Sequence, residues 1–142
     1  MNNSNADWRE TTLQGMTLEQ KVVHLLMPWA REMDADKWAQ EVEKYQLGSL
    51  FIIPGDPEPT RAFIAAIQAK SSFPLLIAAD IETGYRMKFP QQMGCAAESG
   101  PQEMRQRGVL LARIARAVGI HWTLSPVIDL ALNHALQYPG AI

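Results

Sequence analysis

The chain has 142 residues, of which 47% are hydrophobic and 20% charged, so it has enough apolar surface for the core of one globular domain. Its net charge of −2 gives no basic excess that would favour nucleic acid or an anionic membrane as a partner. The single cysteine, Cys95, excludes an internal disulfide framework and a zinc site built from several cysteines. No two histidines have metal-ligand spacing, and we expect neither a metal nor a cofactor.

The amino terminus carries no targeting signal that the sequence reveals. Residues 1–16 form a polar lead-in that could include a short helix near Trp8, without the apolar run of a secretory signal. No stretch approaches the roughly 20 apolar residues of a membrane span. We therefore expect a cytoplasmic protein.

Two helices are predicted ahead of the first strand. Thr17 and Gln20 have the spacing of a capping box, in which each side chain bonds the backbone N–H of the other residue. The apolar residues that then recur at helical spacing are Leu18, Val22, Leu25 and Leu26. Pro28 is expected to end or kink this helix. A second helix is predicted over residues 36–45.

After residue 46 the pattern alternates between short apolar runs and amphipathic segments, with residues 81–100 as a long irregular stretch. The predicted strands cover 47–53, 74–80 and 120–129, and the predicted helices cover 61–70 and 101–118. Strands that alternate with helices favour an α/β fold with a parallel sheet, here of about three strands with flanking helices. Because the strands are apolar on both sides, we expect a sheet that is covered on both faces.

Carboxylates lie at the ends of two predicted strands. Asp80 ends the second strand, and Asp129 ends the third. The carboxyl ends of parallel strands face the active site in α/β folds, so both are candidates for chemistry. Residue types alone leave open whether they act on a ligand or cap loops by accepting backbone N–H bonds.

Glu82 would lie about 6.6 Å from Asp80 on an extended strand. We expect residue 82 in the loop, however, and do not interpret the two as an acid/base pair.

Other reactive or aromatic side chains are interpreted as structural. His121 is expected near the start of a strand, away from the catalytic edge, as a packed or partly exposed side chain. Cys95 has no neighbouring charge that would clearly lower the pKa of its thiol, which favours a small buried residue over a nucleophile. Trp8, Trp29 and Trp38 are assigned to the N-terminal helices, where core packing or an open surface is expected rather than sugar stacking.

Four segments, in order along residues 16–133, resemble one known family. They are Met16–Val22, Leu47–Phe51, Leu75–Gly84 followed by Phe89–Pro90, and Gly119–Asp129. The first is similar to an opening helix with the pattern MTLEEKVGQL, and the second to a glycine-containing first strand. The third is similar to a strand and loop with D-x-E-G-G, and the last to GINWxFAPVxDV. Each segment alone is a weak signal, but together they make the chain resemble the N-terminal domain of glycoside hydrolase family 3.

The resemblance implies the N-terminal part of a (β/α)8 TIM-like barrel over residues 17–142. It also implies a retaining β-glycosidase, of the β-glucosidase or β-N-acetylglucosaminidase type, as the complete enzyme. Asp80 would bind hydroxyls of the β-linked sugar in the −1 subsite. Lys88 stands where some members carry a substrate-binding arginine, and it keeps the charge without the bidentate fork. Thr83 replaces the first glycine of the loop motif, and Asp129 matches a recurring aspartate that we interpret as structural.

The resemblance further implies that the catalytic residues lie outside this sequence. In the family, the aspartate nucleophile, a lysine–histidine pair and the acid/base all follow the segments matched here. A full barrel needs about 250 residues, and three strands cannot close one. Whether the chain is an enzyme is therefore left open, and we expect no glycosidase activity from these 142 residues alone.

Two alternatives to a glycosidase fragment remain. One is a non-catalytic relic or a sugar-binding or partner-binding module, which would self-associate through its uncovered barrel edge. The other is an unrelated small α/β protein. The order of the four segments favours the glycosidase fragment over this last possibility.

Overall fold

The computed structural model describes residues 4–81 and 100–124. The helices are α1 (Ser4–Gly15), α2 (Leu18–Val23), α3 (Ala35–Tyr45), α4 (Pro57–Gln68) and α6 (Pro101–Val118). The strands are β1 (Trp29–Ala30), β2 (Ser49–Ile52), β3 (Leu76–Ala79) and β4 (Trp122–Thr123). From β1 onward, strands and helices alternate, which confirms the predicted α/β pattern. No helix in these ranges is long and apolar enough to cross a membrane.

The four strands form one parallel sheet in the order β1-β2-β3-β4, so their order follows the chain without reversal. One row of paired residues runs across all four strands, with Ala30 opposite Ile52, Ile52 opposite Ala79, and Ala79 opposite Thr123. About three strands were predicted, and β1 is the additional one. A strand of two residues is too short to produce a periodic pattern. Residues 125–129, predicted as the end of the last strand, lie outside the described ranges.

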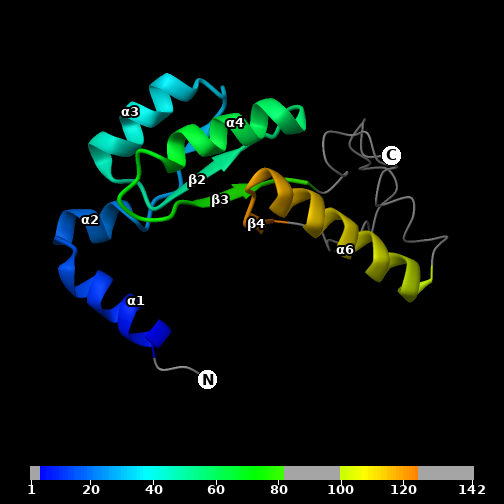
Figure 1. The fold of residues 1–142 in the computed structure, drawn as a ribbon, viewed down its shortest axis with the longest axis horizontal. Helices are drawn as coiled ribbons and strands as arrows, with labels where there is room; N and C mark the ends of the chain where they lie inside the picture. Colours follow the sequence, from blue (N-terminus) through cyan, green and yellow to red (C-terminus); the bar gives the residue numbers. More distant parts are fainter. Residues whose placement is uncertain (1–3, 82–99, 125–142) are drawn as a thin grey trace, which may run out of the picture.

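Helices α3, α4 and α6 lie in a row along one face of the sheet, with α4 in contact with both neighbours (Figure 1). Right-handed crossovers explain this arrangement, because a strand order that does not reverse brings every crossover helix to the same face. The core between helices and sheet is apolar. Its strand residues are Ala30, Leu50, Ile52, Ile77 and Ala79, and its helix residues include Val42, Phe63, Ile64, Ile67, Ala115 and Val118.

The opposite face of the sheet, here called the open face, is exposed at Trp29, Leu76 and Trp122, although Ala78 between them is buried. Side chains alternate along a strand, so Trp29, Phe51, Ala78 and Trp122, which pair across the four strands, share this second face. Trp29 and Trp122 are each 45% exposed. The prediction of cover on both faces is therefore wrong for Trp29 and Trp122, although it holds for Ala78, which is 0% exposed. Trp29 also lies in a strand, not in a helix as predicted.

The N-terminal helices pack loosely. The predicted capping box is present, since Gln20 N–H donates to Thr17 Oγ1 and Thr17 N–H donates to Gln20 Oε1. The helix ends at Val23, well before Pro28. The apolar residues that recur at helical spacing after Thr17 are all exposed, and these are Leu18, Val22, Leu25 and Leu26. On α1, Trp8 is exposed as well.

The amino-terminal end of the sheet, in contrast, is tightly packed. The ring of His24 meets Phe73 edge-on, with 5.3 Å between ring centroids. A Cβ atom on Gly48 would lie 2.6 Å from His24 Nδ1, so only glycine fits at this position without a shift of the imidazole. The Ser49 hydroxyl donates to the Leu26 carbonyl at 3.0 Å. These contacts attach the turn after α2 to the start of β2.

The two long crossover helices have recognisable end signals. α4 begins at Pro57, four residues before its predicted start, because proline suits the first turn of a helix, where an N–H has no partner. α6 covers the predicted range 101–118. It ends at Gly119, which adopts a left-handed φ of 96° that a side chain would strain.

Candidate functional site

All four strands end at the same edge of the sheet because they are parallel and in register. Each strand continues by one residue beyond the row of paired residues that crosses the sheet. These next residues are Arg31, Ile53, Asp80 and Leu124, and each of them is exposed. In parallel α/β folds this carboxyl edge is where ligands bind, whereas the opposite edge serves stability. The tight packing around Gly48 lies at that opposite edge.

Asp80 directly follows β3 at the carboxyl edge, as the sequence predicts. It is exposed, while the next residue, Ile81, is 4% exposed and belongs to the core. By strand alternation Asp80 shares the open face with Ala78. Within residues 4–81 and 100–124 its carboxylate takes part in no hydrogen bond or ion pair. A carboxylate can accept hydrogen bonds at both of its oxygens.

Arg31 is a second charged residue at this edge, and the sequence analysis missed it. Its guanidinium carbon lies 4.5 Å from the centroid of the Trp29 ring, in a cation–π contact. Two strand spacings separate β1 from β3, which places Arg31 and Asp80 about 10 Å apart across the edge. No sequence signal indicated this position, because β1 itself has no periodic pattern.

Several predicted site residues lie outside the described ranges. These are Lys88, Asp129, Glu82, Thr83 and Cys95. Of the two predicted substrate-binding residues, the structure therefore places Asp80 but not Lys88.

His121 lies just before β4, at the amino-terminal end of that strand and away from the carboxyl edge, which confirms the prediction for its place. Its backbone N–H donates to the Ile77 carbonyl, and its Nδ1 accepts from the Ile77 N–H at 3.1 Å. The imidazole thus extends the pairing of β3 with β4. Partial burial of the ring lowers the pKa of His121 below its usual value of 6.5, and the positive charge of Arg116 lowers it further.

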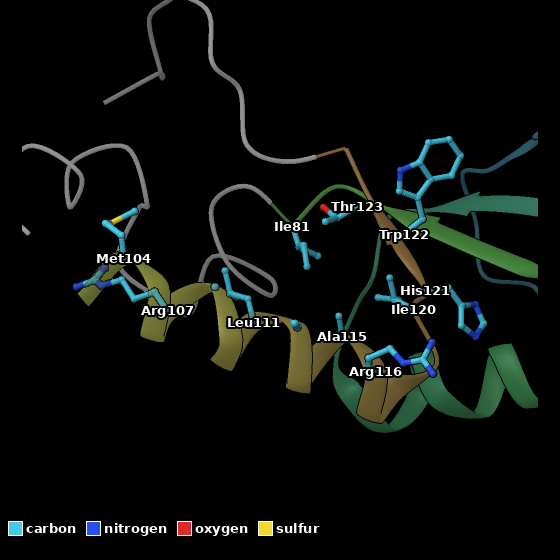
Figure 2. Close-up of a pocket in the computed structure, with 12 residues that line it drawn as sticks. Ile81, Met104, Arg107, Leu111, Ala115, Arg116, Ile120, His121, Trp122 and Thr123 are labelled. Carbon is cyan, nitrogen blue, oxygen red and sulfur yellow. The ribbon is translucent and has the colours of Figure 1, made fainter. Parts of the chain in front are cut away.

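A groove of about 370 Å³ runs between α6 and β4 on the helix side of the sheet (Figure 2). Leu111, Ala115 and Ile120 form part of its apolar wall, and Arg107 and Arg116 lie along α6 beside it. Asp80 does not line this groove. Its lining nonetheless reaches the carboxyl edge, because it includes Ile81, directly after Asp80, and Thr123, which pairs with Ala79. Over the described parts of the chain, no cluster of three histidine, cysteine or acidic side chains could hold a metal ion.

Three comparisons with known proteins agree with this architecture. The model of the glycosyl hydrolase family 3 N-terminal domain matches residues 17–137. A beta-N-acetylglucosaminidase/beta-glucosidase from Cellulomonas fimi is 26% identical over 132 residues, which cover 89% of this chain and 23% of that protein. The solved structure of a beta-glucoside phosphorylase, BglX, bound to 2FGlc superposes with a TM-score of 0.80 at 23% identity, covering 94% of this chain and 25% of that one.

The chain thus spans about a quarter of the length of these two proteins. The structural match shows the same fold, that of the N-terminal part of a (β/α) barrel. The family model covers most of the sequence, including the capping box, the β3 strand with Asp80, and the α6–β4 unit. On this evidence the chain belongs to the N-terminal domain family of glycosyl hydrolase family 3.

Proposed function

We propose that this chain supplies part of the sugar-binding side of a β-glycosidase, with Asp80 holding hydroxyl groups of a β-linked sugar. One observation carries the proposal, namely the exposed carboxylate at the carboxyl end of β3, on the open face of the sheet. A carboxylate in that position can accept two hydrogen bonds from neighbouring hydroxyls and so fix the orientation of a sugar ring.

The substrate class follows from what the two similar proteins are named for. One is a beta-N-acetylglucosaminidase/beta-glucosidase, and the other is a beta-glucoside phosphorylase. Both names refer to β-glucosides, so we propose a β-glucoside or a β-N-acetylglucosaminide as the ligand. Lys88 remains our proposed companion to Asp80, and as a point charge it would bind an oxygen without the planar fork of an arginine.

We also propose that the 142 residues alone do not turn over a glycoside. Retaining glycosidases need two carboxyl groups about 5–5.5 Å apart, one on each side of the scissile bond. In the described ranges, Asp80 is the acidic residue that directly follows a strand at the carboxyl edge. A chain with one binding carboxylate would bind a sugar weakly and leave it intact. A cytoplasmic location also stays a prediction.

Sugar binding can be tested by ligand-observed NMR with methyl β-glucoside and with methyl β-N-acetylglucosaminide. We expect a weak signal for the wild-type chain and at least a tenfold loss of affinity for Asp80→Asn, which keeps the side-chain shape but removes the charge. Asp36→Asn, which changes an exposed carboxylate on α3, is the matched control and should bind like the wild type. Equal binding by Asp80→Asn and the wild type would contradict the proposed role of Asp80.

Turnover is tested separately with nitrophenyl β-glycosides, for which we expect no product from the pure chain. Turnover that disappears in Asp80→Ala would show that these residues contain a working catalytic site. The non-catalytic alternative, a partner-binding module, predicts no sugar signal at all and self-association through the open sheet edge.

A further inference from the structure

The loop that follows β1, residues 31–34, is fixed at the carboxyl edge by the helix after it. The Trp38 Nε1–H donates to the Glu32 carbonyl at 3.1 Å. The Asp34 carboxylate caps α3 by accepting from the Lys37 N–H at 3.0 Å. Two hydrogen bonds thus attach this short loop to the first turn of α3.

A second anchor joins the same loop to α4. The Thr60 side chain is fully buried, and its hydroxyl oxygen accepts from the Gly55 N–H at 3.1 Å, in the loop after β2. The same hydroxyl contacts the Met33 sulfur at 4.0 Å, a long and weak hydrogen bond. The loops after β1 and β2 therefore share one buried contact. Such support is what a binding residue needs, because a displacement of about 1 Å is enough to impair a site.

Arg31 is the basic side chain of the anchored loop. Its guanidinium carbon lies 4.5 Å from the centroid of the Trp29 ring, and the Trp29 ring meets Phe51 edge-on with 6.3 Å between centroids. Trp29 and Phe51 pair across β1 and β2 and share the open face, so the guanidinium lies over that face as well. A guanidinium that rests on an aromatic ring uses its flat face for this contact and keeps its N–H donors along its rim.

Arg31 and Asp80 lie on the same side of the sheet. By strand alternation Asp80 shares the face of Ala78, which pairs with Phe51. Two strand spacings, about 10 Å, separate the strands that carry the cation and the carboxylate. Ile53, which follows the strand between them, is 56% exposed. Two polar groups on either side of an apolar residue are the mixture typical of small-molecule sites.

The chemistry of the guanidinium indicates what it would bind. Paired N–H donors in a planar fork match the oxygens of a carboxylate or a phosphate and form charge-assisted hydrogen bonds with them. Within residues 4–81 and 100–124, no carboxylate lies within ion-pair distance of Arg31, and this includes Asp80. A ligand that spans both residues would therefore present hydroxyl groups to Asp80 and a negative group to Arg31.

We propose that Arg31 determines specificity by selecting a β-glycoside that carries a carboxylate or a phosphate group, with Trp29 as the residue that positions its guanidinium. The inference rests on the proposed function, because it takes Asp80 as the residue that holds the sugar ring. Asp80 fixes where the ring lies, and Arg31 distinguishes an anionic glycoside from a neutral one.

The test compares methyl β-glucoside, methyl β-glucuronide and methyl β-glucoside 6-phosphate by ligand-observed NMR with the 142-residue chain. We expect the wild type to bind at least one of the two anionic ligands about tenfold more tightly than the neutral one, as one charge-assisted interaction would give. Arg31→Gln should abolish this preference and leave the affinity for the neutral ligand nearly unchanged. Arg113→Gln, which removes an exposed arginine on α6, is the matched control for net charge and should keep the preference.

The positioning role of Trp29 is tested in the same assay. Trp29→Leu removes the ring beneath the guanidinium and should reduce the preference for the anionic ligand severalfold, whereas Trp29→Phe keeps an aromatic face and should retain most of it. A purely structural role would instead weaken neutral and anionic ligands equally in Trp29→Leu and would contradict positioning. Circular dichroism checks that every variant is folded.

The outcomes separate this inference from the proposed function. Equal affinities for neutral and anionic ligands, or a preference that survives in Arg31→Gln, would overturn it, while weaker sugar binding by Asp80→Asn would still support the proposed function. A preference that is lost in Arg31→Gln but unaffected, like all binding, in Asp80→Asn would contradict the role of Asp80 and leave the selectivity of Arg31 standing. Inorganic phosphate that binds at Arg31 as tightly as the sugar phosphate would show a site for a simple anion and overturn the inference. Binding of none of the three glycosides would overturn both.

Discussion

The two faces of one sheet differ although their sequences are similarly apolar. On β3, Ile77 is 0% exposed against the helices, while its neighbour Leu76 is 40% exposed on the other face. The difference comes from topology, because the strand order never reverses and all crossover helices therefore return to one side. A doubly wound sheet, in which the order reverses, would have covered both faces. Apolar residues on both sides of a strand therefore do not by themselves show that both faces are covered within the described part of the chain.

The two ends of the sheet show a second contrast. At the amino-terminal end, His24 packs against Gly48 so closely that no Cβ fits between them. At the carboxyl end, Arg31, Ile53, Asp80 and Leu124 are exposed. In (β/α) barrels, residues at the amino-terminal end of the strands contribute mainly to stability, and residues at the carboxyl end contribute to function. The packing of this chain follows that division.

The largest expected effect comes from truncating one residue on each face. Ile77→Ala should lower the free energy of unfolding by about 2–5 kcal/mol, because it leaves a cavity in the helix-side core. Leu76→Ala should lower it by about 0.5 kcal/mol or less at concentrations where the chain is monomeric. Urea denaturation followed by circular dichroism gives both values. Equal losses for the two variants would show that the open face is packed within a single chain.

A smaller effect is expected from two glycines, one in the packed end and one on an open surface. Gly48→Ala should destabilise the chain by about 1–3 kcal/mol, because the new methyl group overlaps the His24 ring. Gly108→Ala, in the middle of α6 with no atom within 4 Å of the added carbon, should stabilise it by about 0.5–1 kcal/mol.

The double variant Gly48→Ala with His24→Ala separates steric overlap from backbone effects. If overlap is the cause, the cost of adding the Gly48 methyl group should be smaller in the His24→Ala background than in the wild type. Thermal unfolding measures all four proteins. The same cost in both backgrounds would show that His24 is not what requires glycine at this position.

The smallest expected effect is a dependence of stability on pH through His121. Its Nδ1 must be neutral to accept from the Ile77 N–H, and partial burial followed by the Arg116 charge keeps its pKa below 6.5 in the folded chain. The unfolded chain therefore binds the proton first as pH falls. Stability should be complete above about pH 6.5 and decline as pH falls from there through the lower pKa of the folded state.

The control for this pH effect is His121→Gln, which cannot titrate but keeps a side-chain acceptor. Its unfolding free energy should change less between pH 7 and pH 5 than that of the wild type, and the other two histidines are present in both proteins. Identical pH profiles would exclude the hydrogen bond between His121 and Ile77 as a source of pH sensitivity.

The sequence predicted the parts of the fold that depend on local chemistry. The Thr17–Gln20 capping box, helix α6 from Pro101 to Val118, and the placement of Asp80 just after a buried strand are all as expected. It did not predict β1 or the exposure of the apolar residues after Thr17. Those features depend on which distant segments of the chain contact them, and a short stretch of sequence does not reveal such long-range contacts.

The candidate site likewise contains one residue that the sequence predicted and one that it did not. Asp80 was predictable because an apolar run that ends in a carboxylate identifies a strand end from neighbouring residues alone. Arg31 was not predictable, because its position at the same edge follows only from the pairing of β1 with β2. Local spacing thus determined the helices, the main strands and one carboxylate. The tertiary structure decided which face of the sheet is open and which side chains share an edge, because these depend on strand order and crossover direction rather than on neighbouring residues.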